Sequence, residues 1–286
     1  DRYWALILKL IADFPADRRT LVSPSLLVNH SFDPAGIHVF VDASNIFIGF
    51  HDQLKRARGI PLSARVPRVD LSFGSLALLL ERRRPVAKRV LAGSTPAVPA
   101  FDEAARIGYE LNVLDKVHKA KELTARQKFF EAAKSPGGQR GQRGTPQHRR
   151  QRSQHTSDLP SDDDEDGDDD EEGEGEGEET PTMTAAKWVE QGVDEILHLK
   201  ICESVIDYSP PSTMVLATGD AAEAEYSQGF LRQVERALKK GWSVELVSWS
   251  RNISAAWRKR SWVEGWGPGK FRVIELDAYA EELLEM

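Results

Sequence analysis

Two aspartates in this chain each follow a short apolar run. Asp42 ends the run at residues 38–41, and Asp220 follows the run at 214–217 through Thr218 and Gly219. We expect each run to form a strand that presents its aspartate at the carboxyl end, where open α/β sheets place their ligand sites. Two converging carboxylates need a proton or a cation between them. Mg²⁺ and Mn²⁺, which prefer oxygen ligands, are the expected cations.

Small polar residues close to these aspartates are candidates for the same crevice. We interpret Asn45 as a group that binds a phosphate or orients Asp42, and Ser44 and Ser94 as residues that line the crevice. Ordinary structural roles compete with these. Ser44 would cap a helix, Ser94 would lie in a turn, and each aspartate would cap the helix after its strand. For Asp42 and Asp220 we favour metal binding, because strand-tip acids line the ligand crevice of open sheets.

The rest of the chain predicts strands that alternate with helices. Residues 1–36 predict a helix and a proline-containing approach to the first strand. Alternation of this kind favours a mostly parallel sheet with helices on both faces, so the predicted fold class is α/β. Strands are expected at 37–42, 86–93, 109–114, 213–217, 243–248 and 271–275, and helices at 44–57, 70–82 with Asp70 as cap, 101–107, 185–205, 227–240 and from Asp277 onward.

A long segment at 134–182 shows no hydrophobic periodicity and predicts a disordered linker, basic first and then acidic. Residues 162–179 hold 14 Asp and Glu, and removing them from the net charge of −7 leaves +7 for the remainder. A basic remainder favours a polyanionic partner. We expect the linker to interrupt one domain, whose halves are 37–133 and 183–286, with 1–36 as an N-terminal helical extension.

The single cysteine, Cys202, excludes an intramolecular disulfide framework and a cysteine zinc cluster. This usage predicts a reducing compartment, cytoplasmic or nuclear, with Cys202 packed in the core. Residues 3–8 are too short an apolar run to span a bilayer, so no membrane is expected. Because the chain begins at Asp1 rather than Met, we expect it to be a fragment. Whether a targeting segment precedes it stays an open question.

Four short motifs occur in order: Val-Asp-Ala-Ser-Asn at 41–45, Ala-Gly-Ser at 92–94, Gly-Val-Asp at 192–194 and Thr-Gly-Asp at 218–220. In motif order and element order, residues 37–276 without the linker resemble the NYN domain of the PIN-like nuclease superfold. The Ala-Glu-Tyr-Ser run that follows is similar to fungal members of that family. The resemblance implies a PIN-like fold and either a metal-dependent ribonuclease or an inactive RNA-binding relative.

The resemblance also implies a third acid, Asp194, beside Asp42 and Asp220. Held by these carboxylates, Mg²⁺ or Mn²⁺ would neutralise the charge that develops on the phosphoryl oxygens during cleavage. Glu190, Asp194 and His198 follow one another at intervals of four and would share one helix face. We interpret Glu190 and His198 as part of a solvated stripe, which is the usual state of such a face.

The chain departs from the pattern of many PIN-like nucleases after Thr-Gly-Asp. Ala221 and Ala222 stand where those proteins carry a second acid, and Glu223 and Glu225 come later. Glu223 is the candidate for an additional metal ligand. The expected function is a Mg²⁺- or Mn²⁺-dependent endoribonuclease with RNA as its partner. The alternatives are a catalytically weak or inactive NYN module that binds RNA and a protein-interaction scaffold.

Basic residues around the second predicted strand supply a candidate RNA contact, since phosphate contacts give affinity without sequence choice. Arg89 is the candidate substrate-binding residue of this cluster. We weigh two interpretations of the cluster equally: RNA binding, and basic residues at a solvated helix end. For the linker arginines, solubility is favoured over specific binding. For the tryptophans between 242 and 266, packing is favoured over base stacking. The basic cluster comprises Arg82, Arg83, Arg84, Lys88 and Arg89.

Overall fold

A six-stranded sheet forms the centre of the computed structural model, which describes residues 2–22, 32–119, 187–222 and 227–285. The strand order is β3-β2-β1-β6-β7-β8, and every neighbouring pair is parallel. The predicted α/β class with a parallel sheet is confirmed, and the layout is consistent with a PIN-like one. The strands are β1 (Phe32–Asp42), β2 (Val86–Ser94), β3 (Glu110–Leu114), β6 (Thr213–Ala217), β7 (Ser243–Ser248) and β8 (Phe271–Glu275).

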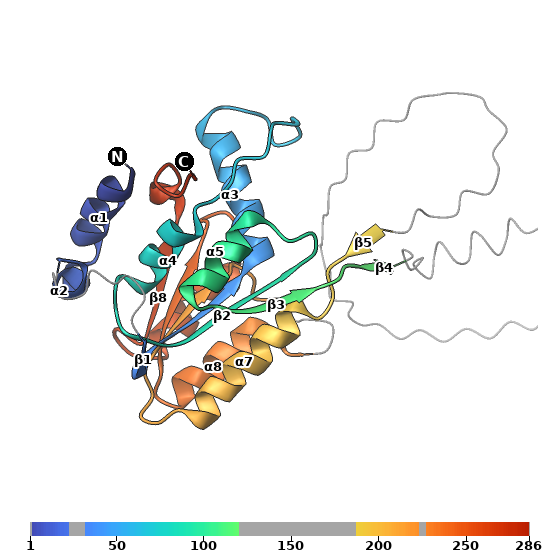
Figure 1. The fold of residues 1–286 in the computed structure, drawn as a ribbon. Helices are drawn as coiled ribbons and strands as arrows, with labels where there is room; N and C mark the ends of the chain where they lie inside the picture. Colours follow the sequence, from blue (N-terminus) through green and yellow to red (C-terminus); the bar gives the residue numbers. More distant parts are fainter. Residues whose placement is uncertain (1, 23–31, 120–186, 223–226, 286) are drawn as a thin grey trace, which may run out of the picture. The chain divides into compact units, whose positions relative to one another are not determined.

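Helices cover both faces of this sheet, with α4 and α5 on one face and α7 and α8 on the other (Figure 1). In the part of the chain that the structure describes, the 3₁₀ turns are η1 (Pro15–Asp17) and η3 (Asp277–Tyr279). The helices are α1 (Arg2–Asp13), α2 (Arg18–Val22), α3 (Ala43–Ala57), α4 (Phe73–Glu81), α5 (Pro99–Ile107), α7 (Val193–Asp207), α8 (Gly229–Lys239), α9 (Ala255–Arg258) and α10 (Arg260–Glu264).

Successive side chains of the central strands point into different cores, as the pleat of a strand requires. Val39 and Val41 of β1 belong to the core under α3, α4 and α5, whereas Phe40 between them belongs to the core under α7 and α8. All three are fully buried. A strand buried on both faces reads as a continuous apolar run, which is why these strands were visible in the sequence.

The N-terminal helices are part of the first core rather than an appendage. Leu6 and Leu10 of α1 and Leu21 of α2 are at most 1% exposed, and they join the cluster that includes α3 and α4. Apolar residues three and four apart put these side chains on one face of α1, which explains why it packs. Helices α1 and α2, within residues 2–22, therefore pack into the same hydrophobic core as α3 and α4.

Both halves of the chain build one compact unit, which comprises Asp1–Val117 and Trp188–Met286. The second unit, His118–Lys187, falls almost wholly outside the described residues, and so does the predicted basic-then-acidic linker. Short strands β4 (Val117–Lys119) and β5 (Lys187–Val189) form a two-stranded sheet. In the described ranges, no helix is long and apolar enough to cross a bilayer.

Several predicted element bounds need correction. Helix α3 begins at Ala43 with Asp42 as its N-cap, so Ser44 is a helical residue and not the cap. The N-cap of α4 is Ser72 rather than Asp70. Helix α7 begins at residue 193 rather than 185, and the segment after Asp277 forms a 3₁₀ turn in place of a longer helix. Strand β1 begins at residue 32, five positions before its predicted start.

Candidate functional site

The strand order reverses between β1 and β6. From β1 the chain adds β2 and β3 on one side and later β6, β7 and β8 on the other. In doubly wound α/β folds, ligands bind at such a switch point, outside the carboxyl ends of the strands. Asp42 ends β1, and the loop of Thr218, Gly219 and Asp220 follows β6 directly. Both predicted strand-tip acids therefore lie at the switch point.

Asp42 is buried, with 6% of its surface exposed, and both of its carboxylate oxygens accept hydrogen bonds. Oδ1 accepts from the backbone N–H of Asn45 at 3.1 Å, which caps α3, and Oδ2 accepts from Thr218 Oγ1 at 2.9 Å. Burial raises the pKa of Asp42 to about 7 against the effect of the Asn45 bond, and Asp194 and Glu190 raise it further. Among the described residues, no cation offsets the charge of this carboxylate.

The loop after β6 is fixed by hydrogen bonds to its backbone. Thr218 Oγ1 accepts from the N–H of Asp220 at 3.3 Å, and the N–H of Gly219 donates to Asn45 Oδ1 at 2.9 Å. A Cβ on Gly219 would lie 2.1 Å from the carbonyl oxygen of Asn252, so only glycine permits this close approach. The side chain of Asn45 therefore anchors the loop, and its backbone, not its side chain, contacts Asp42.

Asp194 lies in the first turn of α7, which starts after Gly192 with its φ of +81°. Its half-buried carboxylate has no hydrogen-bond partner among the described residues. Burial raises the pKa of Asp194 to about 6, and neighbouring carboxylates, Asp220 foremost, raise it further. Since Asp194 in turn raises the pKa of Asp42, the structure gathers the three predicted acids into one electrostatic cluster.

Glu190 precedes α7 and belongs to the site, contrary to its prediction as part of a solvated helix face. Its Oε1 accepts a hydrogen bond from Ser44 at 2.6 Å and another from Ser94. Ser44 and Ser94 therefore line the crevice edge, as predicted, through a carboxylate that sequence reasoning missed. The signal that marks Glu190 is Gly192, because a residue that favours positive φ interrupts the helical pattern just after it.

The chemistry of these acids suits a hard divalent cation, which would relieve both the burial of Asp42 and the crowding with Asp194. Within the described ranges, however, no group of three or more His, Cys, Asp or Glu is placed to hold a metal ion directly. Mg²⁺ commonly keeps several waters and takes one or two carboxylates, and this mode fits the residues present. The further acids Glu223 and Glu225 lie outside the described residues.

Comparison with known proteins does not assign this chain to a family. No family model, no curated protein and no solved structure matches the chain. The likeness to the NYN domain therefore stays a prediction that is carried by the four motifs. What the structure adds is their placement, since the motifs around Asp42, Ser94, Asp194 and Asp220 contribute to one electrostatic and hydrogen-bonded group.

Arg89, the predicted substrate-binding residue, is not available to a substrate. It is 8% exposed, and its Nε lies 2.8 Å from Oε1 of the fully buried Glu81 in an ion pair. Lys88, its neighbour on β2, pairs with Glu203 at 2.8 Å. The assignment of this part of the basic cluster to RNA is therefore corrected to a structural role.

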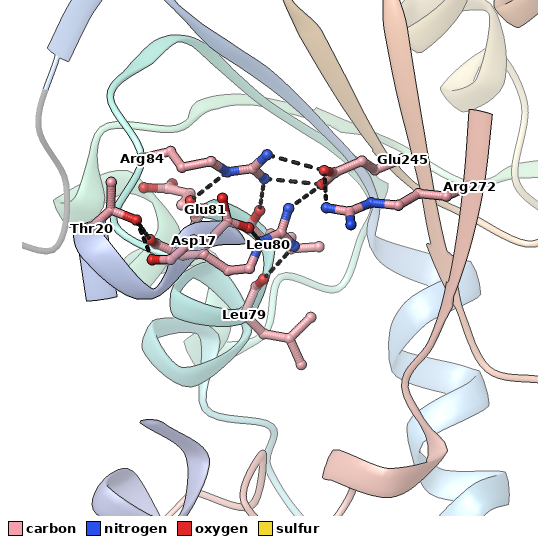
Figure 2. Close-up of polar contacts among 9 residues, drawn as sticks. Asp17, Thr20, Leu79, Leu80, Glu81, Arg84, Glu245 and Arg272 are labelled. Atoms are coloured by element: carbon pink, nitrogen blue, oxygen red, sulfur yellow. Dashed lines mark hydrogen bonds and ion pairs between the residues drawn. The ribbon is translucent and has the colours of Figure 1, made fainter. Parts of the chain in front are cut away.

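Arg82 and Arg84 are likewise engaged inside the fold. Arg82 is fully buried and bonds Asp17 at 2.6 Å and also Glu245. Figure 2 shows Glu245 between Arg84 and Arg272, which reach it from different elements. Burial would raise the pKa of Glu245, but Arg84 and Arg82 lower it to about 2. Neither a solvated helix end nor an RNA surface describes this network.

His198 is buried, and the tryptophans between residues 242 and 266 pack in or against the hydrophobic cores. His198, predicted on a solvated stripe, is 3% exposed; its Nδ1 lies 2.6 Å from Ser227 Oγ, and burial lowers its pKa to about 4. Trp242 and Trp249 are 1% exposed, which confirms that they pack in the core. Cys202 is only half-buried, so its expected place in the core is wrong.

Proposed function

We propose that this chain is a metal-dependent ribonuclease of the NYN kind, which cleaves RNA phosphodiesters with a Mg²⁺ or Mn²⁺ ion held by Asp42, Asp194 and Asp220. One observation carries the proposal: Thr218 joins Asp42 and the backbone of Asp220 at the switch point, where burial and neighbouring carboxylates raise the pKa of Asp42 to about 7 and that of Asp194 to about 6. Acids perturbed in this way in a ligand crevice are typical of functional sites.

The residues around these acids would set where the carboxylates of Asp42 and Asp220 point. Thr218 and the Asn45 backbone hold Asp42 by its two oxygens, and Asp220 Oδ1 accepts from the N–H of Ala222 at 2.7 Å. Fixed carboxylates need no reorganisation when charge develops on the substrate, which favours catalysis. A bound Mg²⁺ or Mn²⁺ would supply neutralisation of the charge on the phosphoryl oxygens.

A catalytically weak or inactive module that binds RNA is the second candidate function. Both oxygens of Asp42 already accept hydrogen bonds, one of them in capping α3, and no described group of three acids is placed to chelate a metal. Ala221 and Ala222 also replace the second acid that many PIN-like nucleases carry after Thr-Gly-Asp. In this case the crevice would hold a strand without cutting it.

Cleavage of a labelled single-stranded RNA in the presence of Mn²⁺ separates these candidates. We expect the parent to cleave and Asp42→Asn to lose cleavage, because the amide keeps the shape and the cap but removes the charge. Asp207→Asn, an exposed acid at the far end of α7, is the matched control. Equal cleavage by parent and Asp42→Asn would refute the enzyme, binding without cleavage would support the second candidate, and no RNA binding would point to a scaffold.

Thermal unfolding gives a readout of the cation that is independent of cleavage. A ligand that binds only the folded state raises Tm by mass action. Mn²⁺ should therefore raise the Tm of the parent and of Asp207→Asn, and should raise that of Asp42→Asn or Asp194→Asn much less. An equal rise in all four proteins would exclude these acids as the metal site.

A further inference from the structure

A cavity of about 660 Å³ adjoins the acid cluster. Ser44, Ser94 and Glu190, the hydrogen-bonded group at the crevice edge, are among its lining residues. From Ser44 its wall follows α3 as far as Lys55, a helix span of about 16 Å at ~1.5 Å per residue. The segment between α3 and α4 and the loop after β2 supply the other walls. The cavity is thus an extension of the candidate site along one helix.

The charge of this cavity is opposite to that of the acid cluster. Four cations line it, and Glu190 is the one acid among its described lining residues. No described residue forms an ion pair with any of the four, and Lys55 only donates to the carbonyl oxygen of Leu62 at 2.6 Å. The pKa of His51, also in the lining, is lowered by burial and by the nearby charge of Arg68. The four cations are Lys55, Arg65, Arg68 and Lys116.

Apolar side chains form the surface between these cations. Ile48 lies on the α3 wall and is 62% exposed, and Val66 on the opposite segment is 39% exposed. Pro96 and Val98, from the loop after β2, also line the cavity. A cavity lined by exposed apolar surface together with four cations that have no ion-pair partner among the described residues matches a ligand that carries both flat apolar groups and phosphates.

We infer, on the basis of the proposed function, that this cavity holds the segment of single-stranded RNA that flanks the bond at the acid cluster. The cations would contact successive phosphates, and the apolar wall would contact the bases. Arg65 and Arg68 would give affinity without sequence choice, because phosphate contacts carry no base information. The substrate of the proposed enzyme is therefore an unpaired strand.

Size and shape favour a single strand over a duplex. Cavities of about 300–1,000 Å³ enclose drug-sized ligands, which are comparable to one or two nucleotides, whereas a paired helix keeps its bases inside the stack. The four cations come from different parts of the chain: Lys55 from α3, Arg65 and Arg68 from the segment between α3 and α4, and Lys116 from the segment after β3. Four cations on different walls suit a ligand with more than one phosphate, and positively charged grooves bind unpaired strands.

Removal of two cavity charges provides the first test. Arg65→Ala/Arg68→Ala changes two exposed side chains between α3 and α4, and Lys239→Ala/Lys240→Ala removes the same charge from two exposed side chains at the C-terminal end of α8, outside the cavity lining. With a short labelled single-stranded RNA at low salt in EDTA, we expect the first variant to bind about tenfold more weakly and its salt slope to fall by about 1.4. The lysine variant should bind like the parent.

An added charge provides the second test and removes no residue that holds the fold. Ile48→Glu places a carboxylate on the exposed cavity wall of α3, and Ile206→Glu makes the same change at a 79% exposed position of α7. Both positions are helical, and Glu is a good helix former, so both variants should fold. We expect only Ile48→Glu to weaken RNA binding, by about tenfold.

The outcomes distinguish this inference from the proposed function. Cavity variants that bind RNA like the parent, while Mn²⁺ still protects the parent and not Asp42→Asn, would overturn the cavity assignment alone. Loss of RNA binding in the cavity variants, with no Mn²⁺ effect on any protein, would support the cavity and overturn the metal site. Equal binding of a duplex of the same sequence, weakened equally by Arg65→Ala/Arg68→Ala, would overturn the assignment to a single strand.

Discussion

Thr218 Oγ1 donates a hydrogen bond to Asp42 Oδ2 across 2.9 Å and so joins the tips of β6 and β1. The same hydroxyl accepts from the N–H of Asp220, which links two candidate acids through one side chain. Thr218 is fully buried, so water does not replace either bond. The separation of the acids at the switch point therefore depends on a residue that carries no charge.

Thr218→Val should destabilise the protein by about 1–3 kcal/mol, because it leaves a buried carboxylate without its donor. Loss of the bond should also raise the pKa of Asp42 further, since the hydroxyl favours the ionised form. Thr218→Ser keeps the hydroxyl and is the control. Urea unfolding at pH 8 measures the difference, and a valine variant as stable as the serine variant would contradict the role of this bond.

The contribution of Asp42 to stability without a divalent cation should fall as the pH rises from about 4 to about 7. The pKa of Asp42 lies near 7 in the folded protein against an ordinary value of 3.8, so the folded state holds a proton that the unfolded state releases. The effect is at most ~4 kcal/mol at about 1.4 kcal/mol per tenfold change. Asp42→Asn should remove this contribution and Asp207→Asn should keep it. Asp194 contributes in the same direction in every variant, whereas His38 and His198, whose pKa values burial lowers to about 4, contribute in the opposite direction.

Glu245→Gln should cost about 3–5 kcal/mol, because it removes the buried carboxylate that Arg82 and Arg84 share and leaves the buried guanidinium of Arg82 with Asp17 as its remaining charged partner among the described residues. The exposed pair of Glu275 with Arg258 is the matched control, and Glu275→Gln should cost less than about 1 kcal/mol. Chemical denaturation at neutral pH compares the two. Equal losses in both variants would contradict the buried network.

The network around Glu245 also predicts a loss of folding stability at low pH. The pKa of Glu245 is lowered to about 2 from an ordinary 4.5, so its contribution is present above pH 4.5 and is lost as the pH falls through 2. Glu245→Gln should remove this dependence. Stability profiles of the two proteins that run parallel between pH 4.5 and 2 would exclude Glu245 as its source.

Gly219→Ala should destabilise the loop after β6 by about 1–3 kcal/mol, because its Cβ would lie 2.1 Å from the carbonyl oxygen of Asn252. Displacement of the loop should also reduce protection by Mn²⁺. Gly265→Ala is the control, since its nearest neighbours lie at 3.4 Å or more. If the Gly219→Ala variant is as stable as the Gly265→Ala control, the loop adjusts to the added Cβ without cost.

The sheet was largely predictable from the sequence, and the exceptions have physical causes. Strands β6, β7 and β8 match their predicted ranges, because they are short apolar runs bounded by polar or turn residues. The first part of β1 escaped prediction because Asp33, Pro34 and Gly36 resemble a loop, and that part of the strand is exposed and irregular in register. Exposed edges leave no hydrophobic pattern to detect.

The part of the candidate site that the sheet topology places was predictable from the sequence. Asp42 and Asp220 follow from the rule that parallel strand tips converge. Glu190 escaped because Val189 and Val193 continue a helical spacing across Gly192, where the backbone departs from a helix. The buried arginines escaped for another reason: Glu245 lies 163 residues from Arg82 along the chain, and no local pattern reports such a partner.

The strand order has a consequence for the synthesis of this protein. β1, which carries Asp42, receives β2 as a neighbour soon after it is made, but its other edge stays open until β6 has emerged. An uncovered edge of a central apolar strand is a template for pairing with other chains. A nascent chain that stalls within residues 120–186 would expose this edge in place of a crevice. Supply of residues 188–286 as a separate piece should then restore solubility and the acid cluster together.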